Sequence, residues 1–113
     1  MRFVLGSKIH NAIVTDAKVE YTGSITIDED LIEKAGFMPY ERVMVVSNTT
    51  GARLETYVIP APKNSGTICM NGAAAHSIKK GEEIIVMGFE LSEKPLKPKT
   101  ILVDKNNKFV KYL

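Results

Sequence analysis

A serine that directly follows a glycine, Gly23-Ser24, could carry out chemistry on its own peptide bond. The serine hydroxyl lies next to the carbonyl of residue 23, where glycine has no side chain to obstruct an attack and permits a strained peptide. Such an attack would exchange the amide for an ester. The pair therefore raises two hypotheses: an ordinary turn between two strands, or a self-cleavage site.

Further polar residues interrupt otherwise apolar strands. Lys8 and Arg53 are cations suited to two carboxylates, and arginine can hold one of them through two parallel hydrogen bonds. On a strand, Arg53 and Tyr57 share a face, with Thr56 on the other face unless a bulge intervenes. Asn71 is another polar residue at the end of an apolar run. Taken singly, each of these residues also has an ordinary structural explanation, as a surface charge, a satisfied hydroxyl or a core tyrosine.

The common catalytic motifs are absent. The chain has no HExxH, no CxxC and no glycine-rich phosphate loop, so we expect neither a metal site nor a nucleotide cradle. We interpret His10 and His76 as structural residues. The acidic residues at 28–30 are more typical of a helix start than of an acid/base pair.

The composition is that of an ordinary globular domain. The 113 residues are 44% hydrophobic and 25% charged, with a net charge of +2, which argues against disordered, collagen-like and membrane proteins. Positive and negative charges are interleaved except in the run KPLKPK, which we interpret as a solvated loop rather than a nucleic-acid site. The single Cys69 indicates a packed thiol in a reducing compartment. We expect a cytoplasmic protein that neither spans a membrane nor binds nucleic acid.

Short β-branched runs bounded by Gly, Pro, Asn and Asp predict a mainly β fold. We expect strands near residues 2–5, 8–16, 17–21, 24–28, 41–48, 53–59, 67–70, 82–91, 100–104 and 109–113, with hairpin turns at 48–51 and 105–108 and a loop at 60–66. A helix is predicted after Asp28, which can cap its start, and before Gly36, which can end it. A second short helix is predicted within 72–80, with Asn71 as its cap.

A faint repeat, ERVMVV at 41–46 and EEIIVM at 82–87, follows each predicted helix and suggests a pseudo-twofold barrel.

Four segments together give a specific resemblance. SKIHNAIVTDA, YTGSITID, GARLETYVI and NGAAAH occur in the order and at the spacings of the pyruvoyl-dependent aspartate 1-decarboxylases, over nearly the whole chain. The resemblance implies one domain, 1–113, folded as a six-stranded double-psi β-barrel with one or two short helices. It also implies a homotetramer with active sites between subunits and a precursor that cleaves itself between Gly23 and Ser24. The products would be a β chain, 1–23, and an α chain, 24–113.

The resemblance implies that residue 24 becomes the cofactor. After the acyl shift, elimination from the ester would leave dehydroalanine, and its hydrolysis would release ammonia and yield a pyruvoyl ketone. That ketone would form a Schiff base with L-aspartate and accept the electrons released as CO2 departs, giving β-alanine for pantothenate synthesis without a metal or pyridoxal phosphate. Thr22 stands where several relatives have an acidic residue, which affects the expected cleavage rate and not the nucleophile.

Residue roles follow from the same resemblance. Thr56 would stabilise the oxyanion during self-cleavage, and Tyr57 would return a proton to the α-carbon of the substrate. Arg53 and Lys8 would hold the substrate carboxylates. The pocket beside the pyruvoyl group would be shaped by Asn71, Gly72, Ala73 and Ala74. Whether a maturation factor takes part stays open.

Two alternatives lead to different expectations. A small binding module for nucleic acid or peptide would show no cleavage and would need a basic stripe with interleaved aromatic residues. A degenerate barrel that keeps the fold without activity should have lost some of the six polar residues, and all six are present: Lys8, Ser24, Arg53, Thr56, Tyr57 and Asn71.

Overall fold

The computed structural model describes all residues from Met1 to Leu113 and is mainly β, as the sequence predicts. Two short helices accompany nine strands. The elements are β1 (Arg2–Ile13), β2 (Asp16–Lys18), β3 (Ser24–Asp28), α1 (Glu29–Ala35), β4 (Arg42–Ser47), β5 (Arg53–Ala61), β6 (Ile68–Asn71), α2 (Ala74–Ser77), β7 (Glu83–Ser92), β8 (Lys99–Val103) and β9 (Phe109–Tyr112). Neither helix is long and apolar enough to span a bilayer.

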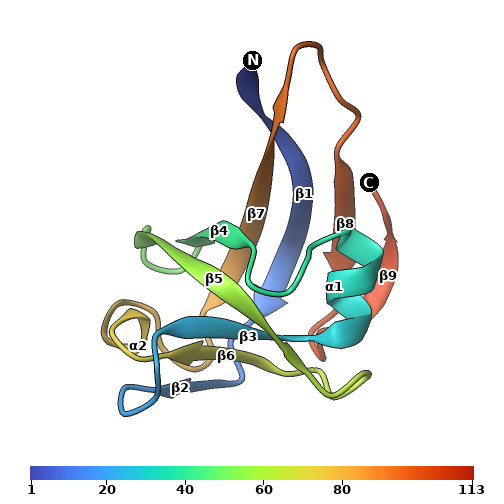
Figure 1. The fold of residues 1–113 in the computed structure, drawn as a ribbon. Helices are drawn as coiled ribbons and strands as arrows, with labels where there is room; N and C mark the ends of the chain where they lie inside the picture. The colour runs from blue at the N-terminus through green and yellow to red at the C-terminus, as the bar shows by residue number, and fades with distance from the viewer.

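The strands form one curled sheet in the order β2-β6-β3-β5-β4-β7-β1-β8-β9. It has more strands than the six of the expected barrel, in part because the short strands β2 and β9 extend it at either end of this order. The pairs β1 with β8, β2 with β6 and β3 with β5 are parallel, and the other five pairs are antiparallel. In Figure 1 the long β1 and β7 rise together towards the N-terminus, while β2, β3, β6 and α2 lie together at the opposite end.

The two copies of the faint repeat become neighbouring strands. β4 and β7 pair antiparallel, with Val45 opposite Val86 and Met44 opposite Met87. Each of these strands follows one of the two helices, as the repeat suggests. Val45 and Val86 are both fully buried, so the repeated apolar residues supply the middle of the core.

Alternation in β3 and β6 decides which side chains enter the core. Ile25 and Ile27 of β3 and Ile68 and Met70 of β6 are fully buried. Because successive side chains on a strand point to opposite faces, the residues between them, Thr26 and Cys69, must lie on the other face of the sheet. The polar residues of these strands are thus placed together by the burial of their apolar neighbours.

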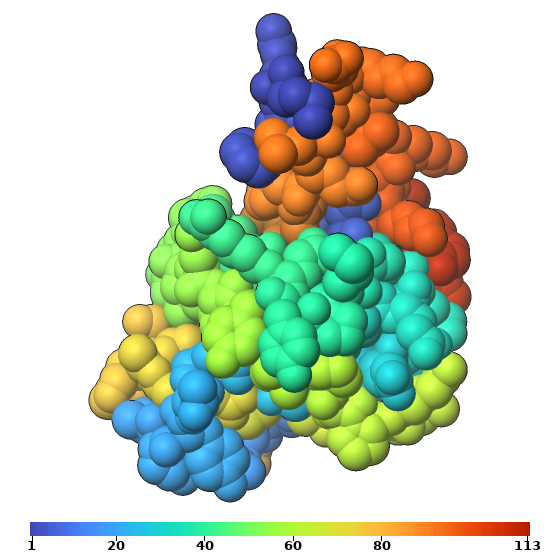
Figure 2. Space-filling model, viewed as in Figure 1, coloured from blue at the N-terminus to red at the C-terminus, as the bar shows by residue number.

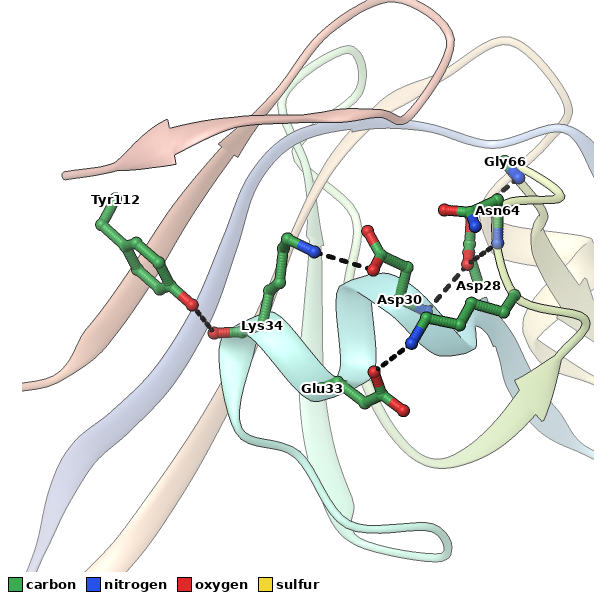
Figure 3. A network of polar contacts seen from close by, with 8 residues as sticks. Asp28, Asp30, Glu33, Lys34, Asn64, Gly66 and Tyr112 are labelled. Atoms are coloured by element: carbon green, nitrogen blue, oxygen red, sulfur yellow. Dashed lines mark hydrogen bonds and ion pairs between the residues drawn. The ribbon is translucent and has the colours of Figure 1, made fainter.

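Helix α1 is anchored through its capping residue Asp28, as Figure 3 shows. The Asp28 carboxylate is 1% exposed and accepts hydrogen bonds from the backbone N–H groups of Asp30, Asn64 and Gly66 at 2.8 to 2.9 Å. Gly36 ends the helix in the left-handed conformation with φ 81°, as predicted. Three hydrogen bonds to one buried carboxylate contribute several kcal/mol, on the order of 1.5 to 3 each, and they fix the end of β3 against the β5–β6 loop.

Local features of three predicted elements differ from the sequence expectation. Residues 2–13 form one continuous strand that contains two bulges, whereas the sequence predicts two separate strands at 2–5 and 8–16. The strand predicted at 17–21 ends at Lys18, and residues 19–23 form the loop before β3. Asn71 does not cap α2: the residue before that helix is Ala73, without a side-chain bond, because the Asn71 amide has partners on β3.

Candidate functional site

Ser24 is the first residue of β3 and directly follows Gly23. The residue is 4% exposed. Its hydroxyl accepts a hydrogen bond from Asn71 Nδ2 at 2.9 Å. It donates a long one of 3.4 Å to the carbonyl of Thr22. The hydroxyl is therefore held beside the peptide bond that the sequence analysis singled out.

The partner of Ser24 is placed by strand register. Ser24 pairs with Asn71 and Thr26 pairs with Cys69 in the antiparallel ladder between β3 and β6. Directly opposite residues share a face of the sheet, so all four side chains lie on the same side. Asn71 Nδ2 also donates to Thr26 Oγ1 at 2.8 Å, and Cys69 Sγ donates to Asn71 Oδ1 at 3.3 Å. We call these four residues the amide cluster.

Gly72 brings a second backbone segment against the Gly23-Ser24 bond. Its φ is +68°, and a Cβ there would lie 2.6 Å from Gly23 Cα and 2.9 Å from the carbonyl oxygen of Tyr21. The Gly72 N–H donates to the Lys18 carbonyl at 2.8 Å. In Figure 2 the residues near 20 and those near 75 accordingly lie side by side at the lower end of the molecule. Glycine is required at 72 for both conformation and space.

Gly23 itself is less constrained than the sequence analysis supposed. A Cβ at this position would meet only the Asn71 carbonyl oxygen, at 4.0 Å, and Gly23 does not have a positive φ. The expected backbone strain therefore finds no support here. The missing side chain still leaves the carbonyl open to approach.

Two cavities adjoin the Gly23-Ser24 bond. One, of about 420 Å³, is lined by Ser24 and Asn71 together with Thr22 and Thr26. The other, of about 470 Å³, is lined by Gly23 and by four of the predicted site residues: Thr56, Tyr57, Ala73 and Ala74. Neither His10 nor His76 lines either cavity. The structure thus gathers most of the predicted residues around one peptide bond.

Strand β5 presents its predicted residues on two faces. Its register with β4 has no bulge, and Thr56 lies opposite the buried Val43, on the core side. Arg53 and Tyr57 therefore share the outer face, as predicted. The Arg53 guanidinium contacts Met44 Sδ at 3.2 Å and takes part in none of the four ion pairs. Tyr57 packs against Tyr40, with ring centroids 6.4 Å apart.

Lys8 is not brought to either cavity within one chain. It lies opposite Met87 on β7, which lies opposite Met44 on β4, which lies opposite Glu55 on β5. Lys8 is therefore in the same cross-strand row as Glu55 but three strand spacings away, roughly 14 Å along the sheet.

The segment after α2 is fixed by a buried carboxylate. Glu82, 7% exposed, accepts hydrogen bonds at 2.6 Å from the Ser47 hydroxyl and from the backbone N–H of Lys79. These bonds, the Ser47 one foremost, lower the pKa of Glu82 and keep it charged. The contact ties the segment that carries Ala73 and Ala74 to the β4–β5 turn.

Sequence analysis missed two members of the amide cluster, Thr26 and Cys69. A threonine in a strand and a thiol in an apolar run both look like ordinary packing residues. The available signal was their i, i+2 spacing from Ser24 and Asn71, but it becomes meaningful only once the β3–β6 register is known. Elsewhere, the structure contains no group of three or more His, Cys, Asp or Glu side chains arranged to hold a metal ion.

Comparison with known proteins gives consistent matches over nearly the whole chain. The family model described as "Aspartate decarboxylase" matches residues 1–110. An aspartate 1-decarboxylase of Neisseria meningitidis is 49% identical over 95% of this chain and 87% of its own length. Those of Caldicellulosiruptor saccharolyticus and Thermoanaerobacter pseudethanolicus are 51% and 50% identical, over 96% and 95% of this chain and 88% and 95% of their own lengths.

The close approach of Gly72 to Gly23 predicts a large effect of a single methyl group. Gly72→Ala should lower the free energy of unfolding by about 3 kcal/mol or more, since it adds a backbone clash to the strain of a left-handed alanine. Gly51→Ala is the matched control: its φ is +83°, but nothing lies within 4 Å of its Cβ. It should cost only about 1 to 2 kcal/mol. Equal losses for both variants in denaturant titrations would contradict the clash.

Proposed function

The chain belongs to the aspartate decarboxylase family, and we propose that it converts L-aspartate to β-alanine and CO2 for pantothenate synthesis. The observation that carries the proposal is the Asn71–Ser24 hydrogen bond beside Gly23. This bond supports the proposal because the hydroxyl that self-cleavage would require contacts another residue that the resemblance assigns to the site.

We propose that residues 1–113 are a single-domain precursor that is cut between Gly23 and Ser24. Ser24 Oγ bonds to the Gly23 carbonyl carbon, the C–N bond breaks, and the hydroxyl proton ends on the freed amine. Residue 24 then loses its Cα proton, a Cα–Cβ double bond forms and the Cβ–Oγ bond breaks, which separates 1–23, with a terminal carboxylate that keeps Oγ, from 24–113. A proton adds to Cβ as the double bond shifts to the nitrogen. Water replaces the amine of residue 24, which leaves as ammonia. Thr56 stabilises the oxyanion of the first step, a role supported by the cavity it shares with Gly23.

The residues around position 24 fit a pyruvoyl group. Ser24 is buried, an amide donor lies 2.9 Å from its Oγ, and the absence of a side chain at Gly72 lets the backbone of this segment approach Gly23 without a clash. The group would be held between Asn71 and the backbone of 72–74. When present, it supplies a ketone that bonds to the substrate amine and acts as an electron sink.

Arg53 binds a substrate carboxylate, and Tyr57 acts as the proton donor. Arg53 is exposed and pairs with no carboxylate of its own chain, so its guanidinium is available for a substrate carboxylate. Tyr57 lies on the same face of β5 and lines the cavity of Gly23. Its hydroxyl returns a proton to the α-carbon after CO2 departs.

Lys8 completes the site from a neighbouring subunit of a homotetramer. Within one chain it lies away from both cavities, so a cation at this position reaches a substrate only if a second copy supplies it. We place the protein in the cytoplasm, where its substrate and a reduced Cys69 are both expected.

The proposed function leads to three predictions, the first of which concerns assembly. Light scattering should give four times the mass of one chain, because the exposed apolar side chains at Phe3, Phe89 and Leu91 become buried when subunits associate. A monomeric mass at micromolar concentration would exclude the proposed role of Lys8 in the site.

Substrate binding generates the second. Arg53→Lys keeps the charge but loses the planar fork, so kcat/KM for L-aspartate should fall by about tenfold or more while cleavage persists. Arg42→Lys is a matched control, since Arg42 lies on the same face and is already paired with Glu55. Unchanged turnover in Arg53→Lys, or an equal loss in the control, would exclude the proposed role.

Self-cleavage generates the third. Wild-type protein should appear in mass spectrometry as 1–23 and 24–113, with the larger piece resistant to Edman degradation because a ketone replaces its amine. Ser24→Ala should fold, assemble and stay one chain without decarboxylase activity. A wild-type protein that remains uncut after prolonged warming, or β-alanine production by Ser24→Ala, would refute the proposal.

A further inference from the structure

The Asn71 amide in the amide cluster has a defined partner at each of its atoms. The two N–H groups of Nδ2 point to Ser24 Oγ at 2.9 Å and Thr26 Oγ1 at 2.8 Å. The carbonyl oxygen Oδ1 accepts from Cys69 Sγ at 3.3 Å. Ser24, Cys69 and Asn71 are 4%, 7% and 5% exposed, so water competes little for these bonds.

The orientation of the Asn71 amide decides whether an N–H donor or a carbonyl oxygen faces Ser24 Oγ. A hydroxyl can donate or accept, so neither Ser24 nor Thr26 alone distinguishes the nitrogen end of an amide from its oxygen end. With nitrogen towards Ser24, an N–H donor faces the oxygen that gains negative charge as it loses its proton. With oxygen towards Ser24, a partial negative charge would face that atom and oppose the change.

The thiol is the group that selects between the two orientations. A protonated thiol donates to an oxygen, whereas an N–H bond to sulfur is weak, so Cys69 favours Oδ1 on its own side. Burial raises the pKa of Cys69, with a further contribution from the charge of Asp16, against a smaller opposing effect of Lys18. The thiol therefore keeps its proton at neutral pH. The other acceptor within its reach, the Met70 carbonyl, is more distant at 3.8 Å.

We propose that Cys69 and Thr26 are positioning residues for the Asn71 amide: Cys69 sets the orientation with nitrogen towards Ser24, Thr26 holds the amide in place, and together they speed the cleavage at Gly23-Ser24. This inference rests on the proposed function, because it concerns the same serine. Neither Cys69 nor Thr26 forms a hydrogen bond with Gly23, and both act through Asn71. Strand register makes this possible, because Thr26 and Cys69 lie directly opposite one another beside the Ser24–Asn71 pair.

The test follows the rate of cleavage in freshly purified precursor by intact mass. Cys69→Ala removes the donor, and cleavage should slow about fivefold to tenfold, the effect of one hydrogen bond. Cys69→Ser restores a donor and should recover at least half of the wild-type rate. Thr26→Val removes the acceptor at nearly constant shape and should slow cleavage to a similar extent, whereas Thr26→Ser should not.

A control variant separates positioning from packing. Met70→Ala truncates a fully buried side chain on the opposite face of β6 and leaves the partners of the amide in place. It should lower the melting temperature at least as much as Cys69→Ala does, yet cleave at the wild-type rate. Slowing in proportion to lost stability across all these variants would overturn the proposal and assign Cys69 and Thr26 to packing.

The remaining outcomes are also distinguishable. If wild-type protein cleaves and Cys69→Ala cleaves equally fast, the positioning role is wrong and the proposed function stands. If Cys69→Ser is as slow as Cys69→Ala, donation by residue 69 is not the cause and the inference fails. If wild-type protein does not cleave at all, the proposed function and this inference fall together.

Discussion

The antiparallel pairing of β3 with β6 is the constraint on which the candidate site depends. Its register is set by four apolar side chains that are fully buried on one face: Ile25, Ile27, Ile68 and Met70. At about 1.5 to 3 kcal/mol each, their burial contributes roughly 6 to 12 kcal/mol. A slip by one residue would turn them out of the core and turn the polar side chains of the amide cluster into it. The hydrophobic core thus fixes the distance between Ser24 and Asn71, although none of its side chains takes part in the chemistry.

A second constraint comes from the loop that connects β2 to β3. The loop 19–23 must return from β2, which pairs with one edge of β6, to β3, which pairs with the other. It passes so close to Gly72 that the backbone of Tyr21 and Gly23 occupies the space that a side chain at residue 72 would need. The Gly23-Ser24 bond is therefore packed against a backbone turn on one side and open to cavities on the other. This combination holds the bond in place while leaving its carbonyl accessible.

Sequence patterns predicted the features that local interactions determine. Helix α1, its cap at Asp28 and its end at Gly36 follow from residue types within one turn, and β3 begins and ends as the alternation in 24–28 indicates. Asn71 was assigned wrongly as a helix cap because its partners, Ser24 and Thr26, are 47 and 45 residues away. The role of Cys69 was missed for the same reason. The resemblance implies which residues form the site, and the register shows which of them touch.

The position of the proposed cut relative to the strands explains how the fold can survive it. Residues 1–23 include all of β1, which lies between β7 and β8 and pairs with both, and β2, which pairs with β6. Cleavage before Ser24 would open a loop without removing a strand from the sheet. The new end at residue 24 begins β3, where pairing with Asn71 continues to hold it. Since Ser24 meets Asn71 only in the folded sheet, the proposed cut would follow folding. The core that positions the serine would then also retain both products, and the site would not have to be reassembled from separate chains.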